Sequence, residues 1–245
     1  MTKQDLQIKT RDGTAKAGLF RSAKASPTKA GVILYQDAFG PRPALDGMAE
    51  RLANEGYAVL VPDLFHRNAP YGPFDAKTAF TEEKTKAALM ALVTGTSQEM
   101  TISDSAAFLD ALAAEGVTGP IGTVGYCMGG ARALNAAATY PDRIKAAASF
   151  HGGNLASDAE DSPHRKAASF KARVYVGMAG VDRSFPPEQS TRLAEAFRDV
   201  EVDHVLENYV GMAHGWCVPD HGVYDEAGAE RHWQRLTTLF AETLI

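Results

Sequence analysis

Short apolar runs alternate with amphipathic stretches along most of this chain. The apolar runs have the length of buried strands, and the amphipathic stretches have the length of helices. This alternation is typical of a mostly parallel sheet that is covered by helices on both faces. The predicted strands are Gly31–Gln36, Tyr57–Pro62, Ile121–Gly125, Lys145–Phe150, Arg173–Met178 and Val202–Tyr209.

The segments before, between and after these strands complete the pattern. Leu6–Lys9 and Ala15–Phe20 alternate in polarity around Asp12-Gly13, which predicts an antiparallel hairpin at the sheet edge. Stripes of apolar residues at helical spacing predict five helices: Pro43–Glu55, Met100–Ala114, Gly129–Thr139, Pro187–Asp199 and Glu226–Leu244.

One irregular stretch, His66–Thr81, interrupts this order before a further predicted helix that reaches Val93. A connection of this length is more typical of a pocket wall or lid than of slack chain. Because we find no linker or internal repeat, we expect one α/β domain over residues 1–245.

Composition and charge narrow the class of protein. A net charge of −5 gives no electrostatic reason to expect nucleic acid or an anionic membrane as partner. The chain starts without an apolar core of signal-peptide length, and no run approaches the length of a membrane span. Its two cysteines, Cys127 and Cys217, form no CxxC pattern, so we expect a cytoplasmic protein. We also expect a monomer or a small homo-oligomer.

The segment GTVGYCMGGARAL places Cys127 between two glycines, after a predicted strand and before a predicted helix. G-x-C-x-G in this context is a thiol version of the nucleophile elbow, in which glycines permit a sharp, strained turn. The helix N-terminus would favour a thiolate there. The same pattern is also compatible with an inert, buried cysteine in a glycine-rich turn.

Two later residues favour the catalytic interpretation. Asp182 follows the strand RVYVGM, and His214 follows the next strand. The order nucleophile, acid, histidine is that of elbow-bearing hydrolases, and the three loops meet at the carboxyl edge of a parallel sheet. We therefore predict Cys127 as nucleophile, His214 as base and Asp182 as the acid that orients it.

The other histidines are weaker candidates. His221 is a rival base because it follows closely after His214, whereas His66 and His151 follow strands at the same edge and could line the pocket. His204 is expected to be structural; His164 and His232 are expected at the surface. No set has zinc spacing, so we expect neither a metal nor a cofactor.

Acyl transfer also requires donors for the developing oxyanion. The expected donors are the backbone amides of Met128, next to the nucleophile, and Ala38, in the loop after the first parallel strand. Asp37 is interpreted either as a helix-entry cap or as a group near the thiol that modulates its proton. Five aromatic residues are predicted pocket walls, although core packing would explain each equally well: Phe39, Tyr71, Phe74, Phe185 and Trp216.

Taken together, the segments YQDAFG, GYAVLVPDLF, VGYCMGGARA, GVDRSFPP and GMAHG resemble the dienelactone hydrolase family of the α/β-hydrolase fold. The resemblance implies the same triad of Cys127, Asp182 and His214, with Met128 and Ala38 as oxyanion donors. The family has Gln-Glu before the oxyanion loop, and that glutamate bonds the resting thiol; the matching residue here is Asp37, one methylene shorter.

The resemblance also bears on the substrate. Dienelactone carries a carboxylate that the family holds with arginines, one of them shortly after the catalytic histidine. Here residues 68–131 contain no arginine, and Trp216 follows His214-Gly215. The candidate replacements are Arg67, Lys77, Lys84 and His221. We therefore expect hydrolysis of a small-molecule ester or lactone, without assigning dienelactone itself.

Two other classes of function remain open. A thiol-dependent acyltransferase or redox protein would use Cys127, in the redox case together with Cys217. A non-catalytic binding protein could also share the fold, because fold does not fix function.

Overall fold

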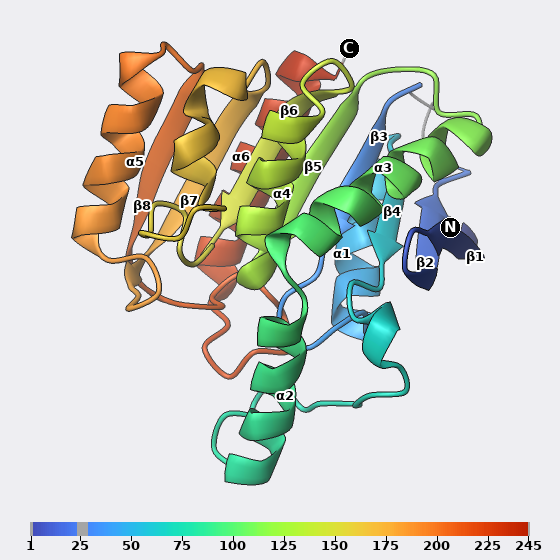
Figure 1. Cartoon of the computed structure of the whole chain (residues 1–245), viewed down its shortest axis with the longest axis horizontal. Coiled ribbons are helices and arrows are strands. Elements are labelled where there is room, and N and C mark those ends of the chain that lie inside the picture. The colour runs from blue at the N-terminus through green and yellow to red at the C-terminus, as the bar shows by residue number, and fades with distance from the viewer. Residues whose placement is uncertain (1, 24–28, 245) are drawn as a thin grey trace.

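Eight strands form one sheet in the computed structural model, which describes residues 2–23 and 29–244. The spatial order is β1-β2-β4-β3-β5-β6-β7-β8 (Figure 1). The first two strands pair antiparallel at one edge, β2 pairs antiparallel with β4, and all the remaining pairs are parallel. The strands are β1 (Thr2–Thr10), β2 (Gly13–Arg21), β3 (Gly31–Tyr35), β4 (Ala58–Pro62), β5 (Ile121–Tyr126), β6 (Ile144–Phe150), β7 (Arg173–Val181) and β8 (His204–Ala213).

Helices cover both faces of the sheet, because the central strands are apolar on both sides. Ile33 packs on one face with side chains of α3, α4 and α5, whereas Val32 packs on the other face with side chains of α1 and α6. Successive side chains of a strand point to opposite faces, so a run such as GVILY supplies both cores at once. The helices are α1 (Pro43–Asn54), α2 (Glu83–Gly95), α3 (Gln98–Ala114), α4 (Met128–Thr139), α5 (Pro187–Asp199) and α6 (Glu226–Thr243).

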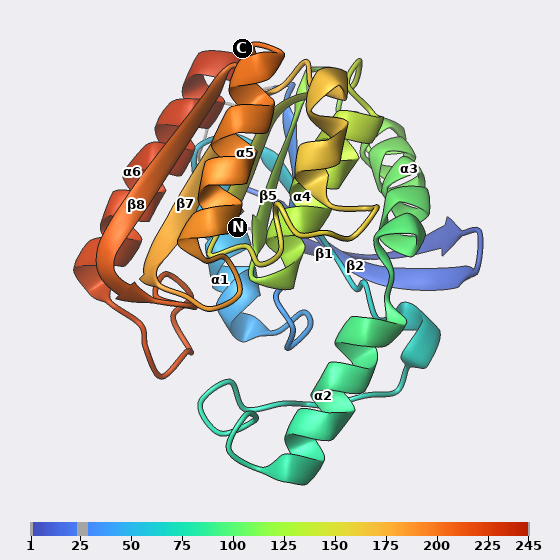
Figure 2. The same ribbon diagram turned by 60° about the vertical axis from the view of Figure 1, so that its left-hand side comes forward.

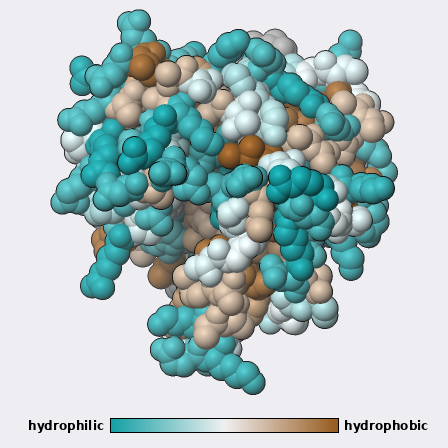
Figure 3. All heavy atoms as spheres, viewed as in Figure 1, coloured by the Kyte–Doolittle hydropathy of each residue, from teal (hydrophilic) through white to brown (hydrophobic). Residues whose placement is uncertain are grey.

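The segment between β4 and α3 leaves the body of the molecule. It contains the short 3₁₀ helix η1 (His66–Asn68), a loop and α2. We call residues 69–97 the arm; α2 projects beyond the carboxyl ends of the strands, away from the layers of the sheet (Figures 1 and 2). In the space-filling view, this projection carries apolar surface beside polar atoms (Figure 3). Phe80 and Met90 are exposed large apolar side chains of this arm.

The predicted α/β architecture is confirmed, including the edge hairpin and the helix of Pro187–Asp199. The differences lie at element ends: β1 begins at Thr2 rather than Leu6, and β8 is displaced to His204–Ala213. A second 3₁₀ helix, η2 (Pro163–Ser169), was not expected from the sequence. No helix among the described residues is both long and apolar enough to cross a membrane.

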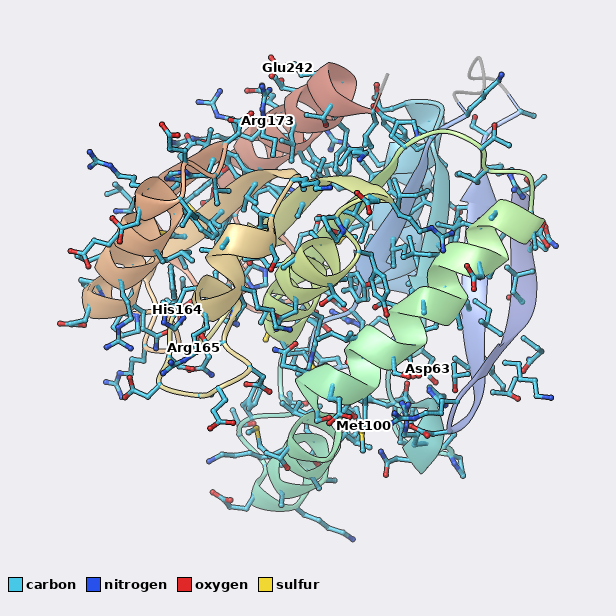
Figure 4. All side chains as sticks on the ribbon, turned by 45° about the horizontal axis from the view of Figure 1, so that its top comes forward. Asp63, Met100, His164, Arg165, Arg173 and Glu242 are labelled. Atoms are coloured by element: carbon cyan, nitrogen blue, oxygen red, sulfur yellow. The ribbon has the colours of Figure 1, made fainter. Side chains whose placement is uncertain are left out.

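Ion pairs join elements at the end of the sheet away from the arm. Arg173, at the start of β7, lies beside Glu242 of α6 (Figure 4), with 2.6 Å between Nη1 and Oε2. Asp63, which follows β4, lies at the other end in the same view. Because β3, β5, β6, β7 and β8 are parallel neighbours, the carboxyl ends of β3, β5, β7 and β8 share one edge of the sheet. The loops after these strands form the candidate site.

Candidate active site

Cys127 occupies a strained turn between β5 and α4. Its backbone has φ 55° and ψ −121°, a conformation that non-glycine residues rarely adopt. A Cβ on Gly125 would lie 1.9 Å from the carbonyl oxygen of Gly129. A Cβ on Gly129 would lie 2.4 Å from the carbonyl oxygens of both Tyr35 and Gln36. Glycine is therefore required at both positions flanking the cysteine, as the elbow motif predicts. The turn leaves Cys127 partly exposed.

His151, directly after β6, holds the backbone of this turn. The Cys127 amide donates to His151 Nδ1 at 3.1 Å and to the Phe150 carbonyl oxygen at 3.2 Å. Since Nδ1 accepts this bond, the neutral ring carries its proton on Nε2, which is buried without a hydrogen-bond partner among the described residues. Burial, together with the nearby His214 and His221, lowers the pKa of His151 well below its ordinary value. The sequence marked His151 only as a possible pocket residue.

The predicted acid and base meet at the carboxyl edge. His214 Nδ1 lies 2.7 Å from Asp182 Oδ2, and their side chains are 29% and 3% exposed. Ser184, which the sequence did not single out, donates its hydroxyl to Asp182 Oδ1 at 2.7 Å and its amide to the same oxygen at 2.8 Å. The carboxylate is therefore fixed from its own loop while it orients the imidazole.

The charges of these groups are coupled. Burial opposes protonation of His214, but the hydrogen bonds to Asp182 and to the Cys127 side chain outweigh it and raise the pKa of His214 to about 10. Burial likewise opposes ionisation of Asp182, yet His214 and Ser184 hold its pKa below the ordinary value. Asp182 and the Cys127 side chain therefore both favour the charged form of the His214 imidazole.

The loop after β3 packs against the first turn of α4. The close approach of the Tyr35 and Gln36 carbonyl oxygens to Gly129 brings these two segments together. Within the loop, the Phe39 amide donates to Asp37 Oδ1 and the Gly40 amide to the Asp37 carbonyl oxygen. Met128 is the first residue of α4, where amides have no acceptor within the helix.

Asp37 belongs to a buried ion cluster that the sequence did not predict. Arg42 donates to both oxygens of Asp37, at 2.7 and 2.8 Å, and to both oxygens of Asp220, at 2.6 and 2.8 Å. His221 Nε2 lies 3.1 Å from Asp37 Oδ2. Burial opposes ionisation of Asp37, but His221 and Arg42 keep its pKa low. Arg42 and Asp220 are 178 residues apart in the chain, so no local pattern announces this pair.

The predicted pocket walls divide into two groups. Phe39, Tyr71 and Phe74 line a cavity of about 400 Å³ beside the arm, and Cys127 is not among its lining residues. Phe185 and Trp216 are packed in the two hydrophobic cores of the sheet. Trp216 has no exposed surface, and its ring contacts that of Tyr209 in a tilted arrangement and that of His151 edge-on, so core packing describes its environment.

The remaining histidines and Cys217 lie outside the triad. His232 was expected at the surface but is fully buried, with Nε2 2.9 Å from the Tyr126 hydroxyl, because α6 places it against the sheet. His66 is bound to Asp104 at 3.2 Å, and His164 is half-buried. Cys217 is a buried free thiol whose pKa is raised well above the usual range by burial.

Comparisons with known proteins bear on the family and the fold of this chain. The sequence profile described as the Dienelactone hydrolase family matches residues 16–244. A carboxymethylenebutenolidase of Pseudomonas putida is 28% identical over 199 residues, which span 80% of this chain and 79% of that protein.

Solved structures give the same result for the fold. A dienelactone hydrolase-like promiscuous phosphotriesterase from metagenomic libraries superposes with a TM-score of 0.83 at 25% identity, covering 100% of this chain and 99% of that one. A dienelactone hydrolase of Anabaena variabilis superposes with a TM-score of 0.68 at 18% identity, again covering 100% and 99%. The match of the family profile to nearly the whole chain establishes that this protein belongs to the dienelactone hydrolase family, and it is a hydrolase of the α/β-hydrolase fold that acts on an ester or lactone.

Proposed function

We propose that this protein hydrolyses a carboxylic ester or lactone through a thioester on Cys127. The observation that carries the proposal is the contact between His214 and Asp182, at 2.7 Å, made by an imidazole that also interacts with the Cys127 side chain. A thiol at a strained elbow, a histidine and a buried carboxylate together form the triad that nucleophilic acyl transfer requires.

In the acylation step, the Cys127 thiolate attacks the carbonyl carbon and the carbonyl oxygen becomes an oxyanion. The amides of Met128 and Ala38 stabilise this charge, an assignment supported by the packing of the loop after β3 against the first turn of α4. The carbon–oxygen bond of the ester then breaks, and His214 donates its Nε2 proton to the leaving alkoxide or enolate. Because its pKa is raised to about 10, His214 carries that proton at neutral pH.

In the deacylation step, water gives a proton to His214 Nε2 and attacks the thioester carbonyl carbon. The carbon–sulfur bond breaks, the acid leaves, and the Cys127 thiolate is restored. His214 can act as base at this stage because the thiolate that helped to raise its pKa has been consumed in the thioester. Asp182 keeps the ring in the required tautomer throughout.

Asp37 takes part indirectly in this proposal. Its oxygens are bound by Arg42, His221 and the Phe39 amide, so we assign it to holding the oxyanion loop rather than to accepting the thiol proton. His221, the rival base, is engaged with Asp37 at 3.1 Å and is therefore assigned to the same positioning cluster.

Burst kinetics with a p-nitrophenyl ester test the proposal. The expected result is a stoichiometric burst of nitrophenol followed by slower turnover, with acyl-enzyme detected on the peptide that contains Cys127. Cys127→Ala should abolish both, whereas Cys217→Ala should keep the burst because Cys217 is buried away from solvent. A Cys127→Ala protein as active as the wild type would overturn the mechanism.

A further inference from the structure

The surroundings of Cys127 carry information about the substrate. Cys127 packs against a compact apolar cluster that joins the oxyanion loop to the arm. We call it the arm cluster; its members are Ala38, Phe39, Phe74, Ala76, Ala79, Leu89 and Val93. None of these side chains carries a charge. A substrate group that contacts this cluster is therefore placed against methyl groups and aromatic rings.

Two arginines in the loops after β3 and β4 are already paired with carboxylates. Arg42 is bound by two carboxylates, and its side chain is only 11% exposed. Arg67 is likewise bound by Asp12 and Asp104. A guanidinium whose donors are taken by protein carboxylates is not available to a substrate carboxylate without breaking those buried pairs.

The donors of the site are already engaged by carboxylates. Asp37 and Asp220 bind Arg42, Asp37 also binds His221, and Asp182 binds His214. Within the described residues, the further cations of the arm and the Asp182 loop are exposed to solvent: Lys77, Lys84, Lys86 and Arg183. Screening by water makes such groups weak partners for a buried carboxylate.

From these contacts we infer that the acyl group accepted at Cys127 is uncharged and apolar, so that the substrates are neutral esters or lactones rather than carboxylate-bearing ones. This inference rests on the proposed function and specifies its substrate class. An anion entering the arm cluster would lose its hydration and gain no paired cation, and this cost disfavours a charged acyl group.

A set of three esters, two neutral and one charged, tests the inference. We expect p-nitrophenyl butyrate and methyl p-nitrophenyl succinate to have kcat/KM values roughly 100-fold above that of mono-p-nitrophenyl succinate, which differs from them by a carboxylate. Comparable values for the charged and neutral esters would overturn the inference while leaving the proposed function standing. Inactivity toward all three would overturn the proposed function, and the inference with it.

Alkylation of Cys127 provides a readout that does not depend on ester hydrolysis. Relative to glutathione measured in parallel, Cys127 should react roughly 10-fold or more in favour of neutral iodoacetamide over anionic iodoacetate, because the arm cluster offers a carboxylate no partner and removes its hydration. A preference for iodoacetate would show that a cation meets the carboxylate and would contradict the inference. If Lys77→Ala then removed that preference, Lys77 would be the carboxylate partner.

A change of specificity gives the most direct test. Val93→Arg places a cation in the arm cluster, whereas Thr94→Arg places the same charge on the exposed side of α2. Val93→Arg should raise kcat/KM for mono-p-nitrophenyl succinate roughly 10-fold and lower it for the butyrate ester. Thr94→Arg should change neither. Ala76→Arg, in the loop of the arm, provides a second placement if Val93→Arg unfolds α2. An equal response to the Val93 and Thr94 variants would overturn the inference.

Discussion

His151 accepts a hydrogen bond from the backbone amide of Cys127, with 3.1 Å between Nδ1 and the amide nitrogen, and its ring centroid lies 4.8 Å from that of His214. One neutral histidine therefore contacts both the turn that presents the nucleophile and the ring of the base. Because burial lowers the pKa of His151, it stays uncharged near neutral pH and does not compete with His214 for a proton.

A pair of substitutions separates the hydrogen bond from the packing of this ring. His151→Phe removes the acceptor and should lower kcat/KM for ester hydrolysis about 5- to 10-fold, the equivalent of one net hydrogen bond. His151→Asn keeps an acceptor near the position of Nδ1 and also tolerates the positive φ of 39°, so it should recover most of the activity. The measurement is kcat/KM beside the unfolding temperature of each variant. Equal losses in both variants would show that packing, and not the hydrogen bond, is what matters.

The ion cluster of Arg42, Asp37, Asp220 and His221 should be a major contributor to stability. Asp37 is fully buried, so Arg42→Ala leaves a carboxylate uncompensated and should lower the free energy of unfolding by about 3 kcal/mol. Urea unfolding measures this loss. The double variant Arg42→Met with Asp37→Asn should recover part of it, because no buried charge is then left unpaired.

A surface ion pair provides the control for that experiment. Lys171 and Asp142 lie 2.8 Å apart but are 63% and 83% exposed. Lys171→Ala should therefore change the free energy of unfolding by less than about 1 kcal/mol. A loss from Arg42→Ala no larger than that from Lys171→Ala would contradict a structural role for the cluster.

The parts of this fold that follow from local pattern were predictable. The run GVILY is buried on both faces, and the segment PEQSTRLAEAFRD forms a helix with Leu193 and Phe197 on its inner side, as their spacing indicates. The elbow was also accessible, because Gly125 and Gly129 form a recognisable G-x-C-x-G motif, although the contacts that require Gly129 come from the distant residues Tyr35 and Gln36. The order of Asp182 and His214 after successive strands then placed them at the same edge of the sheet.

What could not be predicted depends on residues far apart in the chain. His232 was expected at the surface because its neighbours in sequence are polar, yet α6 turns it toward Tyr126, more than a hundred residues away. Arg42 and Asp220 carry no local signal of pairing, since either would be an ordinary surface charge on its own segment. Tertiary packing, and not propensity, decides the environment of such residues.

The close packing at the elbow predicts a severe effect from one methyl group. Gly129→Ala would place a Cβ 2.4 Å from two carbonyl oxygens of the backbone, which cannot move as a flexible side chain could. We expect the free energy of unfolding to fall by at least about 2 kcal/mol, with loss of activity, because β3 and α4 must separate.

Gly47→Ala is the matched control for this change. Gly47 lies in α1, and a Cβ there would meet nothing within 4 Å. Alanine should therefore stabilise the protein by up to about 1 kcal/mol through its higher helix propensity. Urea unfolding should show changes of opposite sign in the free energy of unfolding for the two substitutions. A Gly129→Ala protein with an unchanged free energy of unfolding would contradict the close approach of β3 to α4.

The titration of His214 tests the electrostatic coupling of the triad. Its imidazole resonance, followed by NMR, should titrate with a pKa of about 10 in the wild type. Asp182→Asn and Cys127→Ala should each lower that pKa toward its ordinary value near 6.5, because each removes a group that favours the imidazolium.

The raised pKa of His214 also makes stability depend on pH. Between pH 6.5 and about 10, the folded chain holds a proton that the unfolded chain has lost. The contribution of His214 to the free energy of unfolding is therefore complete below pH 6.5, declines as the pH rises and is absent above about 10. A wild-type His214 that titrates near 6.5 would contradict the coupling, and the Asp182→Asn protein should show a flatter dependence of stability on pH over this window.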